Sequence, residues 1–137
     1  MSDPKCKDEL PRHYKSTMAD IRTLWELYKT DPDASDEELG NFSEYGLAFD
    51  YVPAGTFNDQ KRGFFRYQLS CGGPQEEFRY FCDEGFSVTR VEFWFLNWFD
   101  GAKKILQSND LALMLEIWND WRELGVVESE YKKATTE

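Results

Sequence analysis

The apolar positions in the first part of the chain recur at helical spacing. Over residues 12–29 they stand three or four apart, which predicts a helix, and they are Tyr14, Met18, Ile21, Leu24, Trp25 and Tyr28. The sequence Asp-Pro-Asp at 31–33 ends this helix. Ser35 followed by Glu38 has the S-x-x-E form of a capping box, so a second, short helix is predicted over 36–47.

The middle of the chain changes to a strand pattern. Aromatic-rich segments at 64–71, 76–83 and 87–97 are separated by the turn sequences CGGPQ and DEGF, which predicts an antiparallel meander. The segment 51–57 is a candidate fourth strand. In the last part, Ser108 or Asn109 is expected to cap a helix that runs to Leu124 and ends at Gly125.

Alternation along the strands assigns two faces to this sheet. A turn at 72–75 that places Cys71 opposite Glu76 would set Tyr67 opposite Tyr80 and would keep Cys71 apart from Cys82. The apolar face then holds Phe65, Tyr67, Leu69, Phe78, Tyr80, Val91, Phe93 and Phe95. The reverse face holds charges that we expect to form exposed ion pairs, namely Arg66, Glu77, Arg79, Asp83, Arg90 and Glu92.

These elements predict an α+β fold, an antiparallel three- to four-stranded β-meander with helices packed on its aromatic face. The length of 137 residues is typical of one domain. We expect a flexible leader over 1–11, a single domain over 12–127 and a polar tail over 128–137.

Charge adds a second feature, a long stretch of acids with no base. The segment between Lys29 and Lys61 contains eight acids, Asp31, Asp33, Asp36, Glu37, Glu38, Glu44, Asp50 and Asp59. The whole chain has 26 Asp and Glu against 16 Lys and Arg, a net charge of −10. Such a field repels nucleic acid and anionic membranes and attracts basic protein surfaces. An aromatic content of 17% excludes a disordered acidic tail.

A second acidic row is expected on the last helix, where Glu116, Asp120 and Glu123 share one face. Carboxylates one helical turn apart come near the spacing of nucleic-acid phosphates, so rigid rows of acids can mimic nucleic acid. The alternatives are an acidic surface that only keeps the protein soluble and, for residues 36–38, acids that favour the start of a helix.

Residues for catalysis, metals or cofactors are sparse. His13 is the one histidine and is expected at a solvated helix end. The acids at 31–38 lack the order of a calcium loop, and the three cysteines form no CxxC pair that would favour zinc. We therefore expect no enzyme, metal or cofactor. Without an apolar signal or membrane segment, we expect a cytoplasmic protein with reduced thiols.

The aromatic strands are similar in composition to RNA-binding sheets. Alternation nevertheless assigns most of these rings to the core, and the net charge opposes phosphate. Direct binding of nucleic acid is therefore not expected. Trp94 lies on the polar side of its strand and is a candidate exposed aromatic anchor for a protein partner.

One segment resembles small uncharacterised acidic proteins of phages, prophages and plasmids. It spans residues 63–102, GFFRYQLSCGGPQEEFRYFCDEGFSVTRVEFWFLNWFDGA. The resemblance implies a mobile-element setting, in which small acidic proteins often inhibit host defence nucleases, including CRISPR and restriction complexes. It assigns no catalytic residues.

Together these features favour a non-enzymatic, anti-CRISPR or anti-restriction inhibitor. Its partner would be a basic nucleic-acid-binding host protein, contacted by the acids of 31–59 and by Glu116, Asp120 and Glu123. The alternative is an aromatic-anchored protein-interaction module of a phage or plasmid accessory factor, with Trp94 as anchor. An enzyme that acts through His13 is a third hypothesis.

Overall fold

The computed structural model describes residues 5–57, 60–70, 74–97 and 100–136. In chain order the described elements are α1 (Cys6–Thr30), α2 (Phe42–Tyr45), β1 (Ala48–Val52), β2 (Phe64–Gln68), β3 (Gln75–Cys82), β4 (Val88–Asn97), β5 (Asp100–Ile105), α3 (Ser108–Glu123) and α4 (Val126–Thr135).

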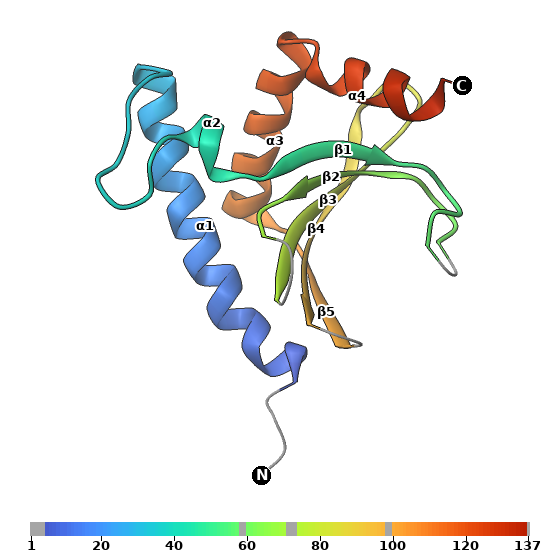
Figure 1. Ribbon diagram of the computed structural model, residues 1–137, viewed down its shortest axis with the longest axis horizontal. Coiled ribbons are helices and arrows are strands. Elements are labelled where there is room, and N and C mark those ends of the chain that lie inside the picture. The colour runs from blue at the N-terminus through green and yellow to red at the C-terminus, as the bar shows by residue number, and fades with distance from the viewer. Residues whose placement is uncertain (1–4, 58–59, 71–73, 98–99, 137) are drawn as a thin grey trace.

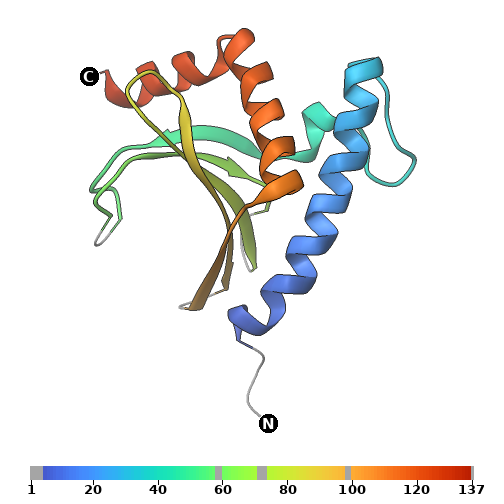
Figure 2. The same ribbon diagram turned by 180° about the vertical axis from the view of Figure 1, so that it is seen from behind.

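The strands form one antiparallel sheet in the order β1-β2-β3-β4-β5. Figures 1 and 2 show the helices on one side of this sheet, where α1 packs against β4 and β5 and α4 packs against β1. The predicted α+β meander with helices on its aromatic face is confirmed. The sheet has five strands because 48–52 and 100–105 each pair along an outer strand of the predicted meander.

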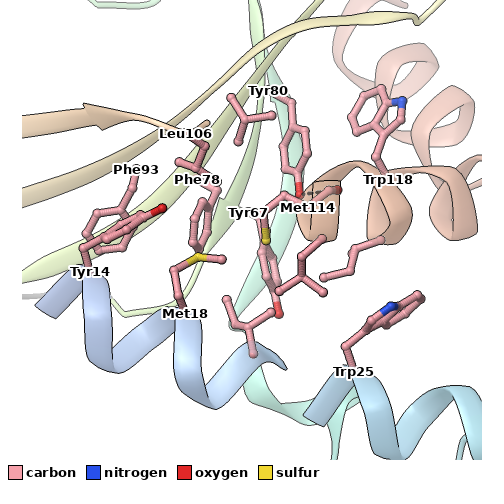
Figure 3. Close-up of a cluster of buried hydrophobic side chains, with 14 of the residues drawn as sticks. Tyr14, Met18, Trp25, Tyr67, Phe78, Tyr80, Phe93, Leu106, Met114 and Trp118 are labelled. Atoms are coloured by element: carbon pink, nitrogen blue, oxygen red, sulfur yellow. Dashed lines mark hydrogen bonds between the residues drawn. The ribbon is translucent and has the colours of Figure 1, made fainter. Parts of the chain in front are cut away.

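The aromatic face of the sheet is the core of the molecule. Phe65, Phe78, Tyr80 and Phe93 are fully buried. Figure 3 shows Tyr14 and Met18 of α1 pointing toward this face, with Trp118 of α3 beside Tyr80. The ring centroids of Tyr80 and Trp118 are 5.0 Å apart in a stacked arrangement. The predicted apolar face of the sheet and the predicted apolar stripe of the first helix are therefore confirmed.

The predicted strand register is wrong by two residues. Phe65 lies opposite Tyr80 and Tyr67 opposite Phe78, whereas Tyr67 was expected opposite Tyr80. A slip of two positions leaves every side chain on its own face of the sheet. The predicted assignment of side chains to the core is therefore still correct. The expected pairing of Cys71 with Glu76 lies outside the described residues.

Helix α1 begins at Cys6, so the prediction of a leader is wrong for residues 6–11. Cys6 and Leu10 are buried and extend the apolar stripe of the helix by two turns at its N-terminal end. The Cys6 amide also donates to Asp100 Oδ2 at 2.7 Å. Pro11 lies inside the helix, and the burial of these neighbours outweighs the lost hydrogen bond that made proline favour a loose segment.

The C-terminal third also contains more structure than predicted. Strand β5 was not expected because the sequence DGAKKI has little apolar alternation, yet its main chain pairs with β4. Helix α3 ends as predicted, and Gly125 takes the left-handed conformation with φ +78°. Beyond it, part of the predicted polar tail forms α4.

We expect Phe78→Ala to lower the free energy of unfolding by about 3–5 kcal/mol, because it leaves a cavity in the aromatic core. Denaturant unfolding followed by tryptophan fluorescence measures this loss. Phe57→Ala is the matched control, since Phe57 is 44% exposed and should cost about 0.5 kcal/mol or less. Equal losses for the two variants would contradict the assignment of the core.

Candidate protein-binding surface

The acid-rich stretch follows α1 as a series of tight turns, so the predicted helix over 36–47 is wrong. Asp36 Oδ1 accepts hydrogen bonds from the amides of Glu38 and Leu39 at 2.9 and 3.1 Å. Gly40 has φ +80°, a conformation that a continuous helix does not contain. The single-turn helix α2 is capped by Asn41, whose Oδ1 accepts from the Glu44 amide at 2.9 Å, rather than by Ser35.

Five carboxylates of this stretch face solvent. They belong to Asp31, Asp33, Glu37, Glu38 and Glu44, and each residue is exposed. Within the described parts of the chain, none of the five takes part in an ion pair. We call residues 31–44 the acidic loop. Its turns are held by hydrogen bonds, so its charges are presented on a shaped surface.

The other predicted acids of this stretch differ from the acidic loop. Asp50 is bound by Arg66, whose Nε and Nη2 donate to the two carboxylate oxygens at 3.1 and 2.8 Å. This pair forms because β1 and β2 place the two residues opposite each other. The charge of Asp50 is thus neutralised by a base distant in sequence. Asp59 lies outside the described residues.

The acidic row on α3 is divided between structural contacts and solvent. Glu116 Oε1 accepts from Trp25 Nε1 at 3.0 Å and lies 3.1 Å from Lys29 Nζ. The indole hydrogen bond, with help from Lys29, lowers the pKa of Glu116 below its ordinary value. Asp120 Oδ2 accepts from Tyr28 at 3.2 Å, whereas Glu123 is exposed.

Sequence reasoning missed an open, mainly apolar pocket of about 300 Å³ beside the acidic loop. Its lining comes from α1, α2, β1, β2, the end of α3 and the start of α4: Tyr28, Phe42, Ser43, Gly46, Leu47, Ala48, Phe49, Tyr67, Asp120, Trp121, Leu124 and Val126. Leu47 and Leu124 at this pocket are 61% and 63% exposed. Leu124 continues the helical spacing of Ile117 and Trp121, and Leu47 precedes Phe49 at strand spacing. The pattern therefore predicts both residues as buried, and only the structure shows that they are exposed.

Glycine allows the chain to pass close to the core at this pocket. A Cβ atom built on Gly46 would lie 2.2 Å from Cε1 of Tyr67, which is far closer than van der Waals contact. The small residue at this point lets the segment between α2 and β1 run over the tyrosine ring. The apolar pocket therefore depends on a close approach between main chain and ring.

Trp94, the candidate aromatic anchor, is half-buried in a stack of side chains on the reverse face of the sheet. The Arg79 guanidinium lies 4.0 Å from its ring centroid and Lys103 Nζ lies 5.5 Å from it. Its Nε1 donates to Glu92 at 2.9 Å. Trp94 is therefore engaged within the protein on both its ring and its polar edge.

The expectation of exposed ion pairs on this reverse face is wrong at its centre. The side chains of Glu77 and Glu92 are only 1% and 2% exposed. Arg79 Nε donates to Glu77 at 2.7 Å while the same guanidinium stacks against Phe64 at 4.6 Å. Long side chains thus lie flat over the carboxylates and shield them from water, although none of the helices in the described residues covers this face (Figures 1 and 2).

His13 does not lie at a helix end, because α1 extends to Cys6. It is half-buried, its ring is 4.5 Å from that of Phe95, and its Nδ1 is 3.9 Å from a Glu76 oxygen. Across the described ranges, no group of three or more His, Cys, Asp or Glu residues is placed to hold a metal ion.

Comparison of the chain with protein-family models, curated proteins and solved structures finds no match. Among the described residues, no helix combines the length and apolar character needed to cross a membrane. Any proposal for the function therefore depends on the protein's own surface.

We expect Arg79→Met to lower the free energy of unfolding by about 3 kcal/mol, because it leaves the buried Glu77 carboxylate without its cation. Arg22→Met is the control, since Arg22 pairs with Asp110 at a site where both side chains are at least 33% exposed. That variant should lose about 1 kcal/mol or less. Urea unfolding at neutral pH compares them, and a loss near 1 kcal/mol for Arg79→Met would contradict the shielding of Glu77.

We expect Trp25→Phe to raise the pKa of Glu116 toward its ordinary value, because the indole donor is removed. Carboxyl carbon NMR over an acid titration measures the shift, with Tyr28→Phe as a control that leaves both donors to Glu116 in place. A lowered native pKa stabilises the fold above the unfolded-state pKa, and this stabilisation is lost as pH falls through the native value. An unchanged pKa in Trp25→Phe would contradict the assignment.

Proposed function

We propose that this protein is a non-enzymatic acidic inhibitor that binds a basic, nucleic-acid-handling defence complex of its host and occludes the nucleic-acid site. One observation carries the proposal: the five exposed carboxylates of the acidic loop have no ion-pair partner among the described residues. Unpaired carboxylates on a fixed surface are available to lysine and arginine side chains of another protein.

The electrostatics favour a partner that normally binds phosphate. A groove lined by Lys and Arg attracts any fixed array of negative charge, and complementary charge increases both the association rate and the specificity. The turns stabilised by Asp36 and Asn41 hold the array in place before binding. Less conformational entropy is then lost when the complex forms.

The apolar pocket supplies a second kind of contact. Stable interfaces commonly combine a desolvated apolar centre with a charged rim. Here Leu47 and Leu124 provide exposed apolar surface, and Glu44 and Glu123 lie close to them in sequence. This combination suits a basic partner that also offers an apolar side chain, and it separates a specific inhibitor from a generally acidic surface.

The resemblance of residues 63–102 to proteins of phages, prophages and plasmids supplies the setting for this proposal. A CRISPR effector or a restriction enzyme is a basic nucleic-acid-binding complex of the kind that such elements need to block. The inhibitor would then act in the cytoplasm of the host cell. Glu116 and Asp120 contribute less than Glu123, because α1 already engages their carboxylates.

The second candidate is a protein-interaction module that depends on apolar anchors rather than on charge mimicry. The exposure of Leu47 and Leu124 favours it. Trp94 is less suited to the role, because Arg79 and Glu92 already engage it. In this model the anchors are Leu47 and Leu124 at the apolar pocket, in place of Trp94 on the reverse face of the sheet.

The test is a pull-down from host lysate by the immobilised protein at about 0.1 M and 0.5 M salt. We expect capture of a nucleic-acid-binding protein that is weakened by salt and competed by added duplex DNA. Glu37→Lys combined with Glu38→Lys should weaken binding to the purified partner about tenfold or more. The control is Asp8→Lys with Glu9→Lys, which makes the same change in net charge at the other end of α1.

Opposite results would select the rival model. If Leu47→Ser and Leu124→Ser abolish binding while the acidic-loop double variant binds normally, the apolar-anchor module is correct. Salt-insensitive capture of a protein that binds no nucleic acid would overturn the inhibitor proposal.

A further inference from the structure

The apolar pocket beside the acidic loop contains a polar group that the fold itself does not use. Tyr67, which lines the pocket, is only 5% exposed, and its hydroxyl group makes no hydrogen bond within the described residues. A Cβ atom on Gly46, another lining residue, would lie 2.9 Å from this oxygen. Burial raises the pKa of Tyr67, so the hydroxyl keeps its proton at neutral pH. Because buried polar groups are nearly always hydrogen-bonded, this hydroxyl indicates a ligand that enters the pocket.

Two separate pairs of packed rings line the pocket. Tyr28 and Phe42 form one pair, with ring centroids 5.4 Å apart, and Phe49 and Trp121 form the other, with centroids 4.5 Å apart. No ring contact joins the two pairs within the described residues, so the rings do not fill the pocket. Figures 1 and 2 show α2 and the start of β1 between α1 and α3, the elements from which these rings come. The volume of about 300 Å³ suits a single side chain or a small ligand.

The pocket is negatively charged. Asp120 is the one charged residue among the lining residues that the structure describes. Its Oδ2 accepts from the Tyr28 hydroxyl group at 3.2 Å, but it forms no ion pair within the described ranges. Burial and the nearby Asp120 charge raise the pKa of Tyr28. Asp120 is therefore a weak member of the exposed acidic row, yet its Oδ1 is available to a cation that enters the pocket.

A guanidinium group fits this combination better than an ammonium group or an apolar side chain. It is planar and weakly hydrated, stacks on aromatic rings, and has several N–H donors that can bind a carboxylate and a hydroxyl group together. The methylene groups of an arginine side chain also pack well against apolar walls. An ammonium group is compact and strongly hydrated. An apolar side chain would bury the Tyr67 hydroxyl and the Asp120 carboxylate without a partner, which is costly.

We infer that the apolar pocket binds an arginine side chain of the partner protein, with the guanidinium group at Asp120 and Tyr67 and the methylene groups against the apolar walls. The choice of a protein as the source of this arginine rests on the proposed function. Arginine is enriched among the residues that contribute most to binding at interfaces, and it is common on surfaces that contact phosphate. The pocket would then recognise one side chain, while the acidic loop attracts the basic surface around it.

The test is a titration of the full chain, followed by ¹H–¹⁵N NMR, with three blocked amino acids. They are acetyl-arginine-amide, its neutral isostere acetyl-citrulline-amide, and acetyl-lysine-amide, and no partner protein is needed. We expect saturable shifts at residues 46–49 and 120–124. The arginine compound should bind at least about fivefold more tightly than either of the other two.

Two variants test the polar contacts. Asp120→Asn keeps the shape of the side chain and should remove the preference for the arginine compound over the citrulline compound. Tyr67→Phe keeps the ring and should weaken the binding of the arginine compound about threefold or more. Asp8→Asn is the matched control, because it removes the same charge from an exposed site at the far end of α1. This control should bind as the parent protein does.

The inference and the proposed function can fail separately. If the arginine compound binds the pocket but the pull-down captures no nucleic-acid-binding protein, the proposed inhibitor function is wrong and the arginine site stands. With a purified partner, Asp120→Asn should weaken binding about tenfold. The inference is overturned if the three compounds bind equally, if Asp120→Asn has no effect on either the compounds or the partner, or if shifts are confined to residues 31–38.

Discussion

The packing of Trp118 against the aromatic face of the sheet is the contact on which the rest of the structure depends. Its ring stacks on Tyr80 and meets Phe65 edge-on, and its Nε1 binds the carbonyl of Phe86. The Tyr80 hydroxyl in turn donates to the Met114 carbonyl at 3.3 Å. These contacts fix α3 across the sheet, and α3 then places Glu116 and Asp120 against α1 and Leu124 at the apolar pocket.

Charge in this protein is divided between compensated and uncompensated groups. Carboxylates that meet another element are engaged, as with Asp50 and Arg66 or Glu116 with Trp25 and Lys29. The acidic loop connects two elements and meets no base among the described residues. The negative field is therefore concentrated where the chain is free to contact a partner, which is the physical basis of the proposed function.

The two faces of the sheet exclude water in different ways. One face is covered by helices and filled with rings. The other has no helix over it in the described part of the chain. Its own long side chains cover it, with Arg79 between Phe64 and Trp94 above the buried Glu77. A guanidinium can satisfy a carboxylate at its edge and stack on rings with its faces, so two buried acids are tolerated under a single layer of side chains.

The sequence by itself determined the fold class, the apolar face and most helix and strand positions, because hydrophobic periodicity reports which side chains leave water. It also located the acid-rich stretch. Tertiary structure decided the start of α1, the existence of β5 and the register, since each depends on partners distant in the chain, such as Asp100 for Cys6. It likewise decided which acids remain free and where the apolar pocket lies. The neighbours of a residue in sequence do not reveal that Arg66 lies opposite Asp50 or that Tyr131 lies beside Tyr51. These contacts form only when the strands and helices pack.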